Sequence, residues 1–415
     1  MKIFYVTRDI ERALGTEPSE NYIIITNRTP YSESIQKNYP DFVHLISAAD
    51  INVDNKDMAI SQGLLDTVAL LKSNIAKKLI DSPIMVFKNT ALIEAVVKEN
   101  GWTLLNPFSK LAEKIENKIT QIAWLGELGN KYLPPHTVAL TKDLVWKKEP
   151  LIIQWEHGHT GLGTILINSD AELTELKSKF PERTARATSF INGPSFTINV
   201  VVNKSEVLLG NISYQITGLP PFTDNVFSTI GNDWSLTHSI LSEAEIEEIH
   251  NMAKEIGALM SRDGWKGLFG LDFIKDDERG RIFLIEINAR QPASTTYESF
   301  LQEENRRNGL VGATIFEAHI AAISGKNIDS TPIIPINDGA QIIQRITKKI
   351  HTSANSLIDV PTDEISGTLE LLGYRVIGYP NTAINEDLLR IQSQKGIMET
   401  HGKFNARGKE ILEIL

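Results

Sequence analysis

The stretch from Gly270 to Arg290 constrains the fold of this chain more than any other segment. Two runs in which apolar and polar residues alternate flank a charged turn, as in the two strands of a hairpin. A three-residue loop with a left-handed glycine is a favoured hairpin connection, and Glu278-Arg279-Gly280 fits it. An uninterrupted ladder from that loop pairs Asp277 with Arg281, and therefore Asp272 with Glu286. We predict a β-hairpin in which two carboxylates face each other.

The same alternation predicts which side chains share a face of this hairpin. Ile285 and Ile287 are expected to face the core. Three polar residues of the second strand are expected on the face of Asp272, namely Glu286, Asn288 and Arg290.

Two carboxylates directly opposite each other repel unless a positive charge lies between them. A hard divalent cation is the obvious candidate, with the Asn288 side chain adding a carbonyl oxygen. Mg²⁺ usually takes one or two carboxylates together with phosphate oxygens, so such a site predicts a nucleotide. Arg290 can bind a phosphate or acyl oxygen bidentately. The alternative is a solvated face of an amphipathic hairpin, which explains alternating charge equally simply.

The string Gly270-x-Asp272-Phe273 followed by Glu286-x-Asn288-x-Arg290 resembles the metal signature of the ATP-grasp superfamily, which includes biotin-carboxylase-like enzymes and carboxylate–amine ligases. In that signature an acid on one strand and E-x-N-x-R on the next bind two Mg²⁺ ions. The resemblance implies ATP and Mg²⁺ (or Mn²⁺) as cofactors. It also implies that Asp272, Glu286 and Asn288 are metal ligands and that Arg290 is catalytic.

A glycine-rich loop precedes this hairpin by about 110 residues, between two strand-like runs. Closely spaced glycines let backbone N–H groups approach phosphates and permit a mobile lid. A plain hairpin loop is the alternative. The resemblance places the ATP-grasp lid here, with four candidate nucleotide-binding residues: Gly158, Thr160, Gly161 and Gly163.

The superfamily usually has two lysines that contact ATP. Lys118, in Asn117-Lys118-Ile119-Thr120, matches the first of them. The second normally ends the strand before the glycine loop, where this chain has Gln154. A neutral amide can donate a hydrogen bond to a phosphate oxygen but cannot neutralise its charge.

Two further segments complete the resemblance. The backbone of Ser189, Phe190 and Ile191 matches the hinge that holds the adenine edge, although Phe190 is equally compatible with an ordinary core position. Arg345 matches an arginine that meets the acyl or carboxyphosphate group in biotin-carboxylase-like relatives, and a surface ion pair would explain it as well.

The fold class expected is mixed α/β and α+β. Strand-like and helical runs alternate in the first hundred residues, which favours a doubly wound, largely parallel domain. Strands are expected at 3–6, 22–25, 42–46, 84–87 and 103–105, with helical runs at 64–79 and 91–100. A further helix is expected at about 243–262, where apolar residues recur on one face. The resemblance divides the chain into a pre-ATP-grasp domain, a small lobe with the lid, a large lobe with the hairpin, and a C-terminal α+β region, at residues 1–107, 108–187, 188–330 and 331–415.

Composition excludes several functional classes. The formal net charge of −10 leaves no basic footprint for nucleic acid. The chain has no cysteine, which excludes disulfides, thiolate zinc sites and cysteine nucleophiles. No apolar stretch of about 18 residues occurs, so we expect a soluble, cytoplasmic protein without a membrane partner. A homodimer is the oligomeric state expected.

The resemblance implies an ATP-dependent ligase that activates a carboxylate as an acyl-phosphate, which an amine then attacks to form an amide. The expected partners are therefore a small-molecule carboxylate and an amine. Two alternatives stay open: a bicarbonate-using carboxylase or carbamoyl-phosphate-type enzyme, favoured by Arg345, and a nucleotide-binding module without turnover, suggested by Gln154.

Overall fold

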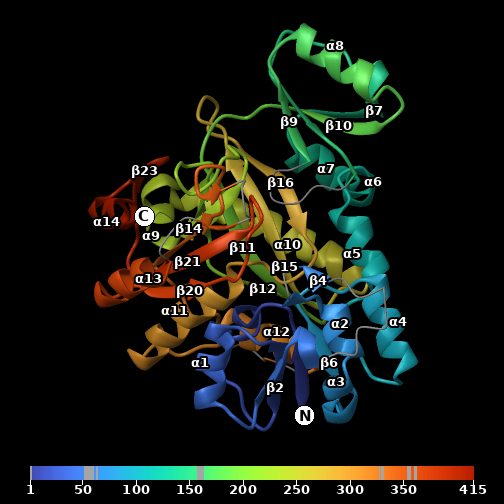
Figure 1. The fold of residues 1–415 in the computed structure, drawn as a ribbon. Coiled ribbons are helices and arrows are strands. Elements are labelled where there is room, and N and C mark those ends of the chain that lie inside the picture. Colours follow the sequence, from blue (N-terminus) through green and yellow to red (C-terminus); the bar gives the residue numbers. More distant parts are fainter. Residues whose placement is uncertain are drawn as a thin grey trace.

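The computed structural model describes residues 2–50, 60–61, 64–156, 163–326, 328, 331–352, 357–358 and 362–415. The described chain forms a lower body and a small lobe that projects from it (Figure 1). No helix within these residues has the length and apolar character needed to cross a bilayer.

The N-terminal region is built on a four-stranded parallel sheet in the order β3-β2-β1-β6. Helices cover it, as predicted for a doubly wound unit. Its strands are β1 (Ile3–Val6), β2 (Tyr22–Asn27), β3 (Val43–Ile46) and β6 (Ile84–Val86), with a short pair β4 (Ile60–Ser61) and β5 (Leu64–Leu65). Its helices are α1 (Pro30–Asn38), α2 (Thr67–Lys72), α3 (Asn74–Leu79) and α4 (Ala91–Glu99).

Two expectations for this region are wrong in detail. The helical run at 64–79 begins as the short strand β5 and is then divided at Ser73, which ends α2 and caps α3 with its side chain. Ser73 has an extended backbone, because a side-chain oxygen caps best from that conformation. The segment 103–105 makes a single bridge between Leu104 and Ile84 and does not form a strand.

Three short helices lead from this region to the small lobe: α5 (Ser109–Glu116), α6 (Thr120–Leu125) and α7 (Glu127–Tyr132). The small lobe is an antiparallel sheet in the order β7-β10-β8-β9, with α8 (Asp170–Lys179) packed on it. Its strands are β7 (His136–Leu140), β8 (Leu151–Gln154), β9 (Thr164–Ile167) and β10 (Thr184–Ser189). The lobe has a hydrophobic core of its own, which includes Trp155 and Leu173.

A nine-stranded sheet forms the centre of the large lobe, in the order β16-β15-β11-β13-β14-β17-β21-β20, with β12 added to β11. Its strands are β11 (Ser195–Asn203), β12 (Glu206–Leu209), β13 (Ser213–Thr217), β14 (Thr229–Asp233), β15 (Gly267–Lys275), β16 (Ile282–Asn288), β17 (Ala340–Arg345), β20 (Arg375–Gly378) and β21 (Asp387–Ser393). The C-terminal strands β17, β20 and β21 therefore extend the large lobe's own sheet.

Helices cover both faces of this sheet. One face carries the main core with the predicted helix α10 (Glu243–Arg262). On the other face lies α12 (Ile315–Ile323). Its Phe316 packs in the core of the N-terminal region and its Ile315 packs against β11 and β15, so α12 connects the N-terminal region to the large lobe. The remaining elements are α9 (Trp234–Ile240), α11 (Thr295–Arg307), α13 (Thr362–Leu371), α14 (Ala406–Ile414), β18 (His351–Thr352), β19 (Leu357–Ile358), β22 (Met398–Thr400) and β23 (Lys403–Phe404).

Candidate active site

The hairpin β15–β16 brings Asp272 directly opposite Glu286, as predicted. The route to this pairing differs from the prediction. Near the turn the ladder pairs Lys275 with Ile282, one residue out of the expected register, and a bulge beside Phe273 then restores it. Gly280 is left-handed as expected, with φ of 64°.

The bulge explains one wrong expectation about facing. Ile287 is buried in the main core, but Ile285 is only partly buried and lines a cavity. Because the bulge adds one residue to β16 between Leu284 and Glu286, simple alternation fails there.

The carboxylate of Asp272 is held by two amides. Gln215 Nε2 donates to Oδ1 at 2.7 Å, and Asn288 Nδ2 donates to Oδ2 at 2.9 Å. Burial, followed by the charge of Glu286, raises the pKa of Asp272 to about 6. Since the Asn288 amide nitrogen points to Asp272, its carbonyl oxygen is left for another partner.

Lys118 supplies the positive charge on the other side of the pair. Its Nζ lies 2.8 Å from Glu286 Oε1, and its side chain is 5% exposed. Burial lowers the pKa of Lys118. Burial acts to raise the pKa of Glu286, but Lys118 outweighs it and the net pKa falls below the ordinary value. The lysine expected to contact ATP thus lies against an expected metal ligand.

A cavity opens between the small lobe and this hairpin. Its lining includes Ser189, Phe190 and Ile191 together with Asp272 and Glu286. The predicted adenine hinge therefore lines the same cavity as Gln154 and as Glu286, the partner of Lys118. The N–H groups of Ser189 and Phe190 already donate to the carbonyls of Pro135 and Pro150, so only their carbonyl groups remain for an adenine edge.

Arg186, which the sequence analysis missed, also lines this cavity. It is 2% exposed and lies opposite Gln154 in the register of β10 with β8. Its guanidinium donates to the side-chain oxygens of Gln154 and Gln121 and to the carbonyl of Ile285. Burial lowers the pKa of Arg186 to about 10, which leaves it charged at neutral pH.

Most of the predicted glycine lid cannot be placed. Gly158, Thr160 and Gly161 lie outside the described residues. Gly163 is described and directly precedes β9.

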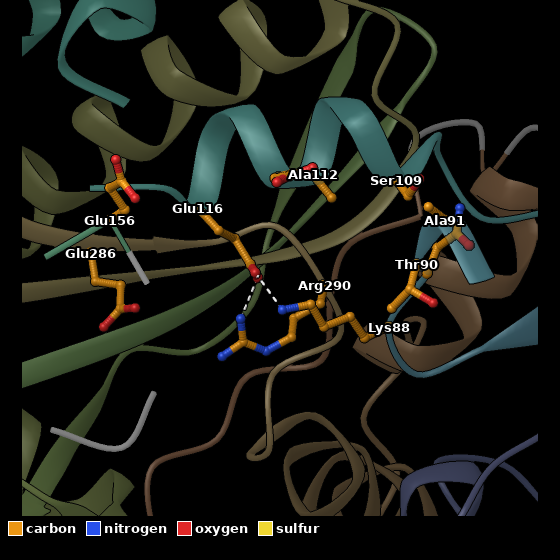
Figure 2. A pocket seen from close by; sticks show the side chains of 11 residues that line it. Lys88, Thr90, Ala91, Ser109, Ala112, Glu116, Glu156, Glu286 and Arg290 are labelled. Atoms are coloured by element: carbon orange, nitrogen blue, oxygen red, sulfur yellow. Dashed lines mark hydrogen bonds and ion pairs between the residues drawn. The ribbon is translucent and has the colours of Figure 1, made fainter. Parts of the chain in front are cut away.

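A second cavity lies on the other side of Glu286, between the N-terminal region and the large lobe. Figure 2 shows the Glu116 carboxylate reaching both Lys88 and Arg290 in this cavity. Lys88 Nζ is 2.7 Å from Glu116, and Arg290 donates to the other oxygen. Burial acts to raise the pKa of Glu116, but the positive charges of Arg290 and then Lys88 outweigh it, and the net pKa lies below the ordinary value. Glu156 also lines this space, so the cavity carries charges of both signs.

Arg345 does not join these residues. Its guanidinium donates to the backbone carbonyls of Thr229 and Asn385 and lies 3.8 Å from Asp387. It lines neither of the two cavities. The expected role of a second anion clamp has no support in this arrangement, because the side chain is occupied in holding β14 and the loop before β21.

The residues missed from the sequence are those that approach the hairpin from other elements. Arg186 had one signal, because it shares a strand face with Thr184 and Thr188 and alternates with two alanines. Lys88 and Glu116 had none, because their meeting with Arg290 depends on how the N-terminal region docks.

The donors at the hairpin fit a small divalent cation. Asp272, Glu286 and the free carbonyl of Asn288 offer three oxygens on one face, which is the hard donor set that Mg²⁺ prefers. Among the described residues no group of three or more His, Cys, Asp or Glu side chains could hold a metal without further ligands. Phosphate oxygens of a nucleotide would complete such a set.

Known proteins are similar to this chain in sequence and in fold. Residues 115–294 match the family model of the ATP-grasp domain. No match was found among curated protein sequences. The fold is similar to N5-carboxyaminoimidazole synthetase from Staphylococcus aureus, at 12% identity over 100% of this chain and 96% of that one, with a TM-score of 0.62.

Two other solved structures are similar over the whole chain. Carboxyaminoimidazole ribonucleotide synthase from Aspergillus clavatus, complexed with ATP, shares 14% identity over 100% of this chain and 97% of its own, with a TM-score of 0.63. L-amino acid ligase from Bacillus licheniformis shares 14% identity over 100% and 96%, with a TM-score of 0.60. The chain thus carries an ATP-grasp domain between residues 115 and 294 and has the fold of the ATP-grasp superfamily.

Proposed function

We propose that this protein is an ATP-dependent ligase that activates a carboxylate as an acyl-phosphate and joins it to an amine. One observation carries the proposal: Glu286 lines both cavities. The cavity with the adenine hinge and the cavity with Lys88, Glu116 and Arg290 therefore meet at a carboxylate suited to hold the cation beside the terminal phosphate. A phosphoryl group held there can be reached from the second cavity.

The cavity between the two lobes would take ATP, with Asp272, Glu286 and the Asn288 carbonyl holding Mg²⁺. When bound, the cation would neutralise and orient phosphate oxygens. Lys118, whose Nζ lies 2.8 Å from Glu286, would bind a phosphate oxygen beside a cation held by that carboxylate. The solved structure complexed with ATP supports a nucleotide in a protein of this fold.

The second cavity would take the carboxylate substrate and then the amine. A carboxylate oxygen attacks the γ-phosphorus, ADP leaves, and an acyl-phosphate forms. The amine nitrogen then attacks the acyl carbon, and phosphate leaves as the amide forms. Arg290 would stabilise the transferred group, while Glu116 holds its guanidinium in place. No protein nucleophile is required, because the reaction depends on positioning and charge neutralisation.

The bicarbonate-using alternative loses the residue that favoured it, since Arg345 is engaged with backbone carbonyls. The fold is similar to that of L-amino acid ligase and equally to that of the carboxyaminoimidazole synthetases, so fold likeness does not choose between the two reactions, and the substrate test below does.

The test is turnover with pooled substrates. The purified protein is incubated with ATP, Mg²⁺, a set of carboxylic acids and a set of amines, and products are followed by mass spectrometry. We expect ADP and phosphate with a new amide, and a hydroxamate when hydroxylamine replaces the amine. Formation of AMP and pyrophosphate, or a strict requirement for bicarbonate, would contradict the proposal.

A further inference from the structure

The strand position that normally carries the second ATP-contacting lysine holds a neutral glutamine, Gln154. The neighbouring strand holds a buried arginine at the paired position, Arg186. We propose that Arg186 supplies the second phosphate-binding cation in this protein, so that the charge is kept while its source moves from β8 to β10. This inference rests on the proposed nucleotide site.

The surroundings of Arg186 favour an anionic ligand. All its hydrogen-bond acceptors are neutral: the side-chain oxygens of Gln154 and Gln121 and the carbonyl of Ile285. In the part of the chain that the structure describes, no carboxylate lies within ion-pair distance of it; Glu286, which lines the same cavity, is paired with Lys118. A buried cation without a counter-charge is costly. A phosphate in the cavity would provide that counter-charge.

The position of Arg186 along β10 suits a nucleotide phosphate. The predicted adenine hinge begins at Ser189, three residues further along the same strand. Three residues of strand span about 10 Å, comparable with the distance from an adenine edge to the α- and β-phosphates. Both residues line the same cavity, and Asp272 and Glu286 lie at its phosphate end.

Gln154 has a positioning role in this arrangement. Its Oε1 accepts hydrogen bonds from Arg186, and its Nε2 donates to Thr164 Oγ1 at 3.2 Å. Gln121 is fully buried; its Oε1 accepts a hydrogen bond from the guanidinium, and its Nε2 donates to the carbonyl of Ile115 in α5. A lysine at position 154 would remove an acceptor from Arg186 and place two positive charges together. The glutamine and the arginine therefore form a matched pair.

Paired substitutions at positions 154 and 186 test whether the phosphate-binding cation has moved from β8 to β10. Calorimetry would measure binding of ADP with Mg²⁺, and of adenosine, to the full chain and its variants. We expect Arg186→Gln to weaken ADP binding by roughly 10- to 100-fold, the range for one hydrogen-bonded charge. Adenosine affinity should change by less than about twofold, because adenosine has no phosphate. Gln154→Lys alone should also weaken ADP binding, and Gln154→Lys with Arg186→Gln should restore it to within about fivefold.

The controls separate a phosphate-binding role from a structural one. Arg183→Gln changes an exposed arginine of the same segment that packs on Trp155, and it should leave both affinities unchanged. If Arg186→Gln does not fold, the double variant and Arg186→Lys still report on the charge. Equal loss of ADP and adenosine binding, or wild-type ADP binding in folded Arg186→Gln, would overturn the inference.

Failure of the proposed function looks different. Wild-type protein that binds ADP through Arg186 but never forms an amide would contradict the ligase activity and leave the Arg186 assignment in place. Wild-type protein that binds neither ADP nor ATP would overturn both.

Discussion

At the scale of single residues, the facing carboxylates of Asp272 and Glu286 are the feature that most requires a ligand. Burial and the neighbouring charge of Glu286 raise the pKa of Asp272, so both ionised carboxylates together are unfavourable without a cation. Lys118 compensates for only one of them. The sequence pattern indicated both residues, but the predicted pairing is reached only because a bulge restores the register that the turn shifts by one residue.

We expect Asp272→Asn and Glu286→Gln each to reduce ADP formation by at least about 100-fold, since each removes a charge from the phosphate end of the site. Thermal melting should show that both variants fold. Glu278→Gln, in the exposed turn of the same hairpin, should keep full turnover. Full turnover in either carboxylate variant would refute their assignment as metal ligands.

Glu298 provides a pH-dependent prediction. It is fully buried on α11 and accepts hydrogen bonds from the backbone and side chain of Asn211, and burial raises its pKa to about 7 from 4.5. The folded state therefore holds this proton more tightly than the unfolded state, so its contribution to stability falls as pH rises from about 4.5 to 7. The full loss is up to about 3 kcal/mol.

Glu298→Gln removes this titration. Urea denaturation of both proteins between pH 5 and 8 should show the free energy of unfolding of the variant gaining about 1–3 kcal/mol relative to wild type as pH rises. A difference that stays constant over this range would contradict the assignment.

At the scale of elements, strand and helix positions followed from sequence wherever the period was long and regular. Helix α10 begins and ends where predicted, because its apolar residues recur on one face and Ser242 with Glu245 forms a capping box. The bulge in β15–β16 could not be predicted, since nothing local in the sequence distinguishes it from a regular ladder. The break of the 64–79 helical run at Ser73 could not be predicted either, because the helix cap that causes it lies within an apolar pattern.

The cap of α10 gives a prediction at this scale. Ser242→Ala removes the acceptor for the Glu245 N–H and should lower the free energy of unfolding by about 1 kcal/mol. Ser178→Ala, on the exposed surface of α8, should change it by less than about 0.5 kcal/mol. Denaturant titration measures both, and equal effects would argue against the cap. Nucleotide affinity should not change in either variant.

At the scale of the whole molecule, the site depends on docking that sequence alone does not specify. Lys118 comes from the segment between α5 and α6, Arg186 from the small lobe, and Lys88 from the N-terminal region. Lys118 and Arg186 contact the hairpin directly, whereas Lys88 binds Glu116, which in turn holds Arg290, and all of these contacts need the assembled parts of the chain. The hinge and the hairpin were therefore predicted from local patterns. That Lys88 and Arg186 lie beside them could be seen only in the folded structure, whereas Lys118 was indicated by the family resemblance.

The two cavities should respond separately to substitution. Glu116→Gln changes the second cavity by weakening the hold on Arg290 and Lys88. We expect kcat/KM for the carboxylate substrate to fall by about 10-fold and ADP affinity to stay within about twofold. Steady-state kinetics with calorimetry would measure this split. Loss of ADP binding in this variant would show that the cavities are not divided as described.

The most direct test of the account is metal binding at the hairpin. Electron paramagnetic resonance would measure Mn²⁺ bound to wild-type protein and to the Asp272→Asn, Glu286→Gln double variant, with and without ADP. Wild-type protein should bind Mn²⁺ tightly only with the nucleotide, and the double variant should lose this site. Equal nucleotide-dependent Mn²⁺ binding by the folded double variant would contradict this prediction.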